Sequence, residues 1–254
     1  MKIRMITFYV ALALFVGQPT LVEASGAQSR AAAQTVSSTV DAAQEDSIKF
    51  GSRSLHIPRP QGFEPISAVA PAFVQTLQAY NPNRLAEIYV TPADAKIFSS
   101  GQTTDVARYF QLQVARQLDG VEISEEDFRE FSKLAETRMR SIVEDNQEVI
   151  NSQFERGNAK VKRMNSKDPQ ISVSGPRYLG IYRREPWGVF FTMKMNVAAG
   201  GDKEQTPIVL SGALVLANRQ VMNLISYAVF LDASDRKWTE QTVSAWADAV
   251  HKAN

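Results

Sequence analysis

The sequence predicts an α+β domain in which an antiparallel β-sheet is sandwiched between α-helices, with one long central helix and a helix at the C-terminus. Three observations predict this fold. The last third of the chain holds consecutive segments with strand periodicity, joined by short turns. A long segment with helical spacing precedes them, and another amphipathic segment follows them. Consecutive hairpin strands favour an antiparallel sheet, and helices on either side of them in the chain favour two covered faces.

The N-terminus has the pattern of an export signal. Lys2 and Arg4 precede an apolar run from Met5 to Gly17, which is shorter than the roughly 20 residues that cross a bilayer as a helix. Small residues at Val22 and Ala24 fit signal-peptidase cleavage before Ser25, with Gln28 as a second choice. We therefore expect a signal peptide at 1–24 and a periplasmic or secreted protein without a membrane span after cleavage.

The remaining chain divides into a linker and one domain. Residues 25–46 are rich in Ala, Ser, Gln, Thr and Val and lack large aromatic side chains, so they predict a flexible linker. Residues 47–254 are long enough for one hydrophobic core and predict a single α+β domain. The chain has no Cys, so burial alone must hold the domain together and lipid anchoring through a cysteine is excluded.

Strand and helix signals alternate in the first half of the domain. Short alternating segments predict an edge hairpin at 48–57, and Phe73, Leu77 and Tyr80 predict a helix over 70–80. A strand is expected at 85–90, stopped by Pro92. Residues 108–116 alternate apolar with polar side chains and predict a half-buried strand.

The long helix is expected to run from a cap at Ser124 to about Arg156, with Gly157 as its C-terminal cap. Acidic residues follow Ser124 in the first turn, where they complement the helix dipole.

The last third predicts four strands and a helix. The strands are expected at 178–182, 189–197, 208–216 and 221–231, and the last two are apolar enough to be central. Asn218 and Arg219 predict a tight hairpin turn, because Asn tolerates positive φ. The final helix is expected to be capped by Ser234 or Asp235. Its buried face is predicted to carry Trp238, Thr242, Trp246, Ala249 and Val250.

Few residues offer catalytic chemistry. His56 and His251 are the only histidines, and neither lies in a metal-binding or nucleophile motif. His251 falls in the last turn of the final helix, where a cation complements the dipole. Asp232 and Asp235 could ligate calcium, but their place between a strand and a helix favours capping. We expect no enzymatic activity, no cofactor and no metal.

Two segments stand out as candidate binding sites. Arg183, Arg184 and Trp187 lie at a strand junction, and Trp and Arg are enriched at binding hot spots. Gly200, Gly201 and Asp202 lie in a loop at 198–207 that is longer than a hairpin requires. A surface turn with Trp187 packed on the core remains the structural alternative.

One segment resembles the opening that follows the first strand of PsbP-like domains, namely Ile57-Pro58-Arg59-Pro60-Gln61-Gly62-Phe63. The paired final strands and the closing helix with Trp246 also resemble that fold. The resemblance implies an exported bacterial protein with an antiparallel sheet between helices. It also implies a non-enzymatic accessory or binding role.

Three hypotheses for function remain open at this point. The first is an exported, non-enzymatic accessory or protein-binding module with an envelope protein as partner. The second is a small-ligand-binding periplasmic domain, and the third is a hydrolase that uses either paired carboxylates or a serine with His56. The formal net charge of +1 gives no electrostatic reason to expect nucleic acid as a partner.

Overall fold

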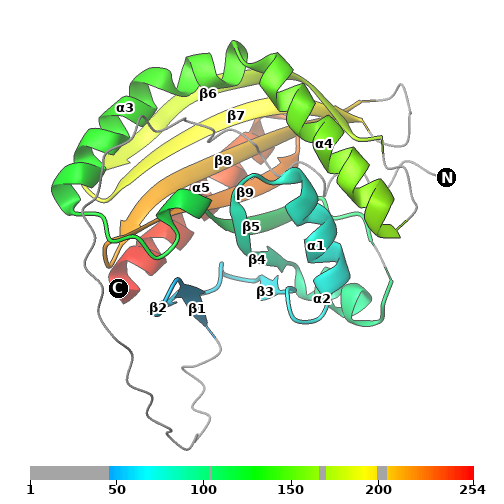
Figure 1. The fold of residues 1–254 in the computed structure, drawn as a ribbon, viewed down its shortest axis with the longest axis horizontal. Helices are drawn as coiled ribbons and strands as arrows, with labels where there is room; N and C mark the ends of the chain where they lie inside the picture. The colour runs from blue at the N-terminus through cyan, green and yellow to red at the C-terminus, as the bar shows by residue number, and fades with distance from the viewer. Residues whose placement is uncertain (1–45, 103, 166–169, 199–204) are drawn as a thin grey trace, which may run out of the picture.

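The computed structural model describes residues 46–102, 104–165, 170–198 and 205–254. The predicted signal peptide and most of the predicted linker lie outside these residues. The described chain is α+β, as the sequence predicts. A seven-stranded antiparallel sheet has the strand order β3-β4-β5-β9-β8-β7-β6, and a separate hairpin pairs β1 with β2. Figure 1 shows α3 and α4 arching over one face of the curved sheet while α5 covers the other.

The elements of the first half follow the expected order. The strands are β1 (Ser47–Phe50), β2 (Arg53–His56), β3 (Glu64–Pro65), β4 (Arg84–Val90) and β5 (Arg108–Val114). The helices are α1 (Pro71–Tyr80) and α2 (Pro92–Ser99), and a short 3-10 turn η3 (Arg116–Leu118) follows β5. The hairpin, α1, β4 and β5 confirm the sequence-based expectations.

Pro92 is the first residue of helix α2. The sequence predicted only that Pro92 ends the preceding strand, so that expectation was incomplete. The Thr91 side chain accepts a hydrogen bond from the Asp94 backbone N–H, and Pro92 takes the first helical position. Proline is favoured at this position because its fixed φ suits the helix and its missing N–H needs no partner. Helix α2 therefore begins with ordinary capping signals.

The expectation of one long helix capped at Gly157 was wrong. The chain forms α3 (Glu125–Glu144) and α4 (Gln147–Asn165), separated by Asp145 and Asn146. The Asn146 side chain donates to the Ser141 carbonyl, 2.9 Å away, and the same carbonyl accepts the Asp145 backbone N–H at the end of α3. This break lets the two helices follow the curved edge of the sheet, which one straight helix could not do. Ser124 does cap α3, by accepting from the Asp127 N–H.

Gly157 lies inside α4 and has a packing role. A Cβ atom at this position would lie 2.3 Å from Cδ1 of Tyr80. The Tyr80 hydroxyl donates to Oδ1 of Asn158, one residue further along α4, at 3.0 Å. The absent side chain thus allows α4 to lie close against α1.

The last four strands are β6 (Ser172–Glu185), β7 (Gly188–Ala198), β8 (Thr206–Ala217) and β9 (Gln220–Val229). Most residues of β8 and β9 are buried on both faces, which confirms their expected central position. Asn218 and Arg219 have φ of 42° and 65°, so the predicted tight turn is also confirmed. Strand β9 ends two residues earlier than expected, and Leu231 is 82% exposed.

Strand β5 is buried on both faces, whereas its alternating sequence predicted one polar face in water. Gln111 is 0% exposed and Gln113 is 1% exposed. Tyr109 belongs to the core under α1–α4, whereas Phe110 and Leu112 belong to the core under α5, so both faces of the strand are covered. Its polar side chains are accommodated by hydrogen bonds to one another.

Helix α5 (Ala233–Ala253) is capped by Asp232, two or three residues earlier than expected. Asp232 and Asp235 form a capping box, each satisfying backbone N–H groups at the start of the helix. Trp246 and Val250 are buried as predicted, but Trp238, Thr242 and Ala249 are only partly buried. The buried face instead includes Thr239, Val243 and Ala247, so it is rotated relative to the expected one.

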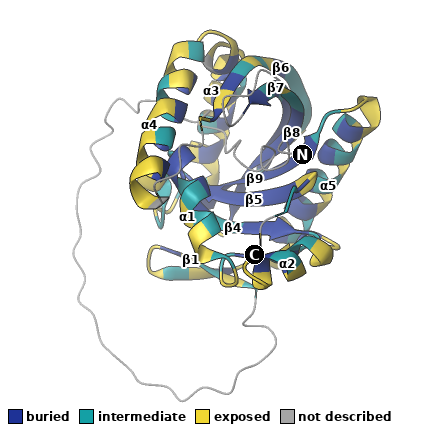
Figure 2. Cartoon of the chain, turned by 90° about the vertical axis from the view of Figure 1, so that its right-hand side faces the viewer, coloured by how far each residue is buried: buried dark blue, intermediate teal, exposed yellow. Residues whose placement is uncertain are grey.

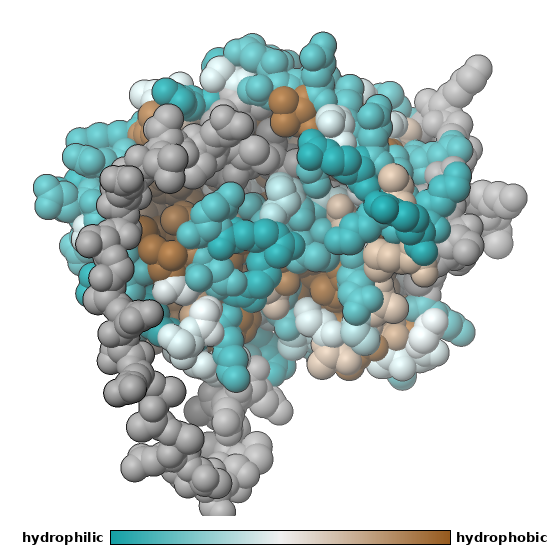
Figure 3. Space-filling view, viewed as in Figure 1, coloured by the Kyte–Doolittle hydropathy of each residue, from teal (hydrophilic) through white to brown (hydrophobic). Residues whose placement is uncertain are grey.

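The sheet separates two cores. One lies between the sheet and the helices α1, α2, α3 and α4, and the other lies between the sheet, α5 and the β1–β2 hairpin. Figure 2 shows buried residues along the strands and exposed residues on the outer faces of the helices. Hydrophilic side chains cover much of the described surface in Figure 3. No helix among the described residues is both long enough and apolar enough to span a membrane.

Candidate functional site

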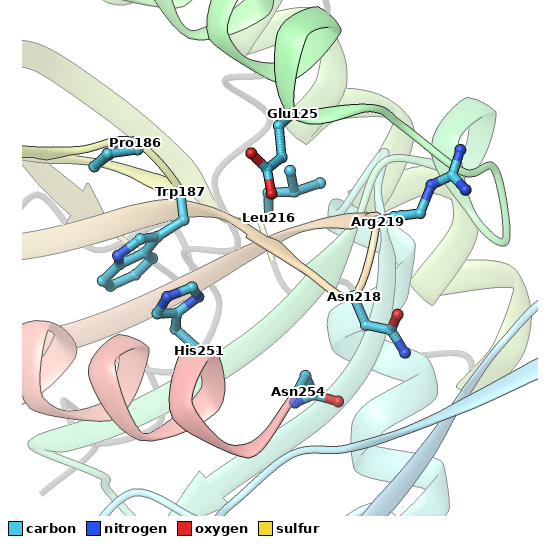
Figure 4. A pocket seen from close by; sticks show the side chains of 8 residues that line it. All are labelled: Glu125, Pro186, Trp187, Leu216, Asn218, Arg219, His251 and Asn254. Atoms are coloured by element: carbon cyan, nitrogen blue, oxygen red, sulfur yellow. The ribbon is translucent and has the colours of Figure 1, made fainter.

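A pocket of about 380 Å³ lies where the β6–β7 turn, the β8–β9 turn and the end of α5 meet. Figure 4 shows the side chains that line it. The eight lining residues are Glu125, Pro186, Trp187, Leu216, Asn218, Arg219, His251 and Asn254. The pocket therefore combines one large aromatic side chain with several groups that can form hydrogen bonds.

The strand pairing brings the two turns together. Gly188 lies opposite Val215 in the β7–β8 ladder, and the Leu216 N–H donates to the Trp187 carbonyl at 2.8 Å. This register places the Trp187 turn beside the end of β8, one residue before the Asn218–Arg219 hairpin begins. Residues about 30 positions apart in the sequence thus share one pocket.

Trp187 and His251 form one wall of the pocket. Their rings stack with centroids 4.3 Å apart and 7° between the planes. Phe190 packs against Trp187 in a T-shaped arrangement, with ring centroids 5.8 Å apart and 83° between the planes. His251 lies in the last turn of α5, where the sequence predicted it, but its stacking on Trp187 could not be read from the chain.

Arg183 supports this wall, and three of its five guanidinium N–H groups form hydrogen bonds within the fold. Its guanidinium makes two hydrogen bonds to Asp248 on α5, at 3.0 and 2.8 Å, and one to Glu185 at 2.9 Å. The hydrogen bonds to Asp248 raise the pKa of Arg183 above its ordinary value, although partial burial opposes this. The guanidinium also lies over the Phe190 ring at 4.6 Å. Arg183 thus fastens β6 to α5.

Arg184 points to the other side of the sheet. Its Nε donates to Oε2 of Glu136 on α3 at 3.1 Å, and 61% of the side chain is exposed. The adjacent arginines of the predicted site are therefore separated by the strand. Gly200, Gly201 and Asp202, the other predicted site residues, lie outside the described residues.

The sequence did not single out the residues that complete the pocket. Arg219 is 60% exposed in its side chain and pairs with Glu122 at 3.0 Å. The Asn254 side chain donates to the His56 carbonyl at 2.7 Å, which ties the end of α5 to β2. The Asn218–Arg219 pair was recognisable as a turn, but only the strand register places that turn beside Trp187.

The hydrolase hypothesis finds no nucleophile-base pair in the described part of the chain. His56 is exposed on β2, and the described residues offer no side-chain hydrogen-bond partner to its imidazole. The imidazole of His251 is stacked on Trp187. Within the described ranges, no three His, Cys, Asp or Glu side chains form a cluster that could hold a metal ion. Asp232 and Asp235 cap α5, as their position favoured.

No protein-family model matches the chain, and a search of curated proteins finds no match either. The PsbP-like resemblance therefore stays an expectation. Two of the segments that suggested it do contact each other, because Nε1 of Trp246 donates to the Pro58 carbonyl at 2.7 Å. Phe63 of the same segment packs edge-on against Phe110, with centroids 4.7 Å apart. The segment thus has a packing role under α5.

Proposed function

We propose that the protein is an exported, non-enzymatic accessory module that binds a partner protein of the cell envelope through the Trp187–His251 pocket. The observation that carries this proposal is the stacked pair at the wall of an open pocket, with hydrogen-bonding groups around it. Trp is among the residue types that contribute most to protein interfaces, especially where polar groups surround it.

The volume and lining of the pocket suit part of a partner chain. A pocket of about 380 Å³ lies near the lower end of the range for small-molecule sites, so it can hold a few side chains at most. Glu125 supplies a negative charge at its rim and Arg219 a positive one. We expect a short partner segment that places an apolar or aromatic side chain against Trp187 and polar groups near Asn218 and Arg219.

The charges and histidines favour binding over catalysis. The imidazole of His251 stacks on an indole ring, which is not the contact with a hydroxyl or carboxylate that prepares a histidine as a general base. His56 is exposed, and its backbone carbonyl accepts a hydrogen bond from Asn254 at the pocket.

Export remains part of the proposal, and it is supported by the sequence pattern of residues 1–24. If the signal is cleaved, the intact mass of protein isolated from the envelope should correspond to a chain beginning at Ser25 or Gln28. A membrane-bound chain that retains Met1 would contradict the export step without bearing on the pocket.

Capture from envelope extract tests the binding proposal. We expect proteins that bind the tagged wild-type chain to be lost with Trp187→Ala, while Leu231→Ala retains them. Leu231 is a suitable control because it is 82% exposed and lies at the opposite end of α5 from His251. Circular dichroism should show that both variants are folded. Equal recovery of the same partners by both variants would contradict the proposed contact site.

A further inference from the structure

Besides His251, two ionisable side chains line the pocket beside Trp187, and in the described part of the chain only one of them has a partner. Arg219 pairs with Glu122 at 3.0 Å. The Glu125 carboxylate forms no ion pair and no side-chain hydrogen bond with any described residue. Figure 4 shows this carboxylate turned towards Trp187 and His251, whereas the Arg219 guanidinium points away from both. The charge left unpaired in the pocket is therefore negative.

Asn254 adds a second hydrogen-bond acceptor to the lining. Its Nδ2 donates to the His56 carbonyl at 2.7 Å and to the Val250 carbonyl at 2.9 Å, so both amide hydrogens are used within the fold. Its Oδ1 has no partner among the described residues. An occupant rich in N–H groups thus finds two kinds of unused acceptor in the pocket, a carboxylate and an amide oxygen.

The fold fixes the position of Glu125. The Ile123 N–H donates to the Arg219 carbonyl at 2.8 Å, which joins the start of α3 to the β8–β9 turn. One helical turn after Glu125, the side chain of Phe128 is fully buried in a small core that also contains Leu216, a residue of the pocket lining. The carboxylate is therefore held beside the pocket before any partner binds, which lowers the cost of binding.

The surroundings of Glu125 are also acidic. Glu126 and Asp127 share the first turn of α3 with it. A helix N-terminus carries about half a positive elementary charge, which three carboxylates exceed, so a net negative charge remains there. Behind the aromatic wall, Asp248 neutralises Arg183 through two hydrogen bonds. A cation at the pocket is therefore attracted by α3 and meets no unpaired arginine in the wall.

We propose that the pocket takes an arginine side chain of the partner protein, with the guanidinium against the Glu125 carboxylate and the aliphatic part along the wall formed by Trp187 and His251. A guanidinium has five N–H donors in one plane, so it can bond to both carboxylate oxygens and keep donors for other acceptors such as Oδ1 of Asn254. Arg219, at the other end of the lining, is then left to donate to carbonyl groups of the same partner segment. This contact rests on the proposed partner-binding function and adds the charge of the segment that binds.

Two short peptides test the charge directly. One is acetyl-Phe-Arg-Gly-amide, and the other has citrulline in place of the arginine, which keeps the shape and removes the charge. Each is titrated into isotope-labelled protein isolated from the cells that make it, and the NMR signal of the Trp187 indole N–H, identified with Trp187→Phe, reports binding. We expect the Kd of the arginine peptide to be about fivefold lower, the upper end of what an exposed ion pair contributes. This preference should largely disappear in about 1 M salt, where the Debye length is about 3 Å.

Matched substitutions in the first turn of α3 locate the charge. Glu125→Gln keeps the size of the side chain and removes its charge, so both peptides should bind this variant with equal Kd. Glu126→Gln removes the same charge from a neighbour that does not line the pocket, and it should retain most of the preference. Both positions are exposed, so both variants should fold.

The outcomes separate this contact from the function on which it rests. A preference for arginine that Glu125→Gln abolishes and Glu126→Gln retains supports the contact. Equal binding of the two peptides to the wild type, no change of the Trp187 signal with either peptide, or a preference that survives Glu125→Gln overturns it. In each of these cases, loss of envelope partners with Trp187→Ala still supports the binding module, whereas unchanged recovery of those partners with Trp187→Ala overturns the contact and the proposed function together.

Discussion

The ring of Trp187 lies parallel to that of His251, with centroids 4.3 Å apart. The first residue comes from the β6–β7 turn and the second from the last turn of α5. Arg183 holds these elements together through its paired hydrogen bonds to Asp248. The Arg183–Asp248 hydrogen bonds therefore hold the elements that carry the stacked pair, and both rings line the pocket. This arrangement is expected of a preformed contact site.

The three tryptophans should differ in their contribution to stability. Trp246 is 2% exposed and donates to the Pro58 carbonyl, so Trp246→Ala should lower the free energy of unfolding by about 3–5 kcal/mol. Trp187 is only partly buried, and Trp187→Ala should cost about 1–2 kcal/mol. Trp238, also partly buried, should fall between them. Chemical denaturation measures all three, and a loss for Trp187→Ala as large as that for Trp246→Ala would make Trp187 a core residue.

Helix α5 should lose stability at acidic pH through Asp235. Burial raises the pKa of Asp235, but hydrogen bonds from the Leu231 and Asp232 N–H groups and from Arg108 outweigh it, so the pKa is lowered overall. Because the pKa of Asp235 is lower in the folded state, its carboxylate stabilises the fold above about pH 4. This stabilisation is lost as the pH falls through the folded-state pKa. Asp235→Asn should therefore lower the melting temperature at pH 7 and approach the wild type as the pH drops below about 4. A constant difference from pH 7 to pH 3 would contradict this role.

Gly157 should not tolerate a side chain despite its helical position. Alanine normally stabilises a helix interior relative to glycine by about 1 kcal/mol. Here its Cβ would overlap the Tyr80 ring, so Gly157→Ala should instead destabilise by about 1–3 kcal/mol. The double variant with Tyr80→Leu should show a smaller effect of the alanine than the single variant does, as measured by a double-mutant cycle. An additive result would show that the ring does not cause the loss.

A substitution in the β8–β9 turn should separate the effect on partner binding from the effect on the stability of the fold. Arg219 has φ of 65°, a conformation that costs non-glycine residues about 1–2 kcal/mol, whereas its exposed pair with Glu122 is worth at most about 1 kcal/mol. Arg219→Gly should therefore leave stability unchanged or raise it slightly. Partner recovery should nevertheless fall, because the positive charge at the pocket is lost. Unfolding curves and quantitative capture would be compared on the same preparation, and a stable variant with full recovery would remove Arg219 from the contact.

The local sequence predicted the elements well where one signal dominated. Continuous apolar runs identified β8 and β9 as central strands, and Asn218 predicted the tight turn between them. Ser124 predicted the start of α3 because an N-cap depends only on its near neighbours. These features need no knowledge of distant residues.

The sequence predicted less where tertiary contacts decide. The apolar spacing continues through Asp145 and Asn146, so only the curvature of the sheet edge reveals the break between α3 and α4. Gly157 resembled a helix cap because its packing partner, Tyr80, is far away in the chain. Gln111 and Gln113 suggested an exposed face, since polar side chains that bond to one another in the interior give the same alternation. Of the candidate site residues that the structure describes, only Trp187 lines the pocket, because its other walls depend on strand register and on the docking of α5.

The most direct test of the account is site-specific photo-cross-linking in living cells. A benzophenone side chain would replace Asn218 at the pocket in one protein and Leu231 at the far end of α5 in another. The account predicts a discrete cross-linked product with an envelope protein from position 218, reduced by Trp187→Ala, and no such product from position 231. The same product from both positions, or a product from position 218 that Trp187→Ala does not reduce, would contradict it.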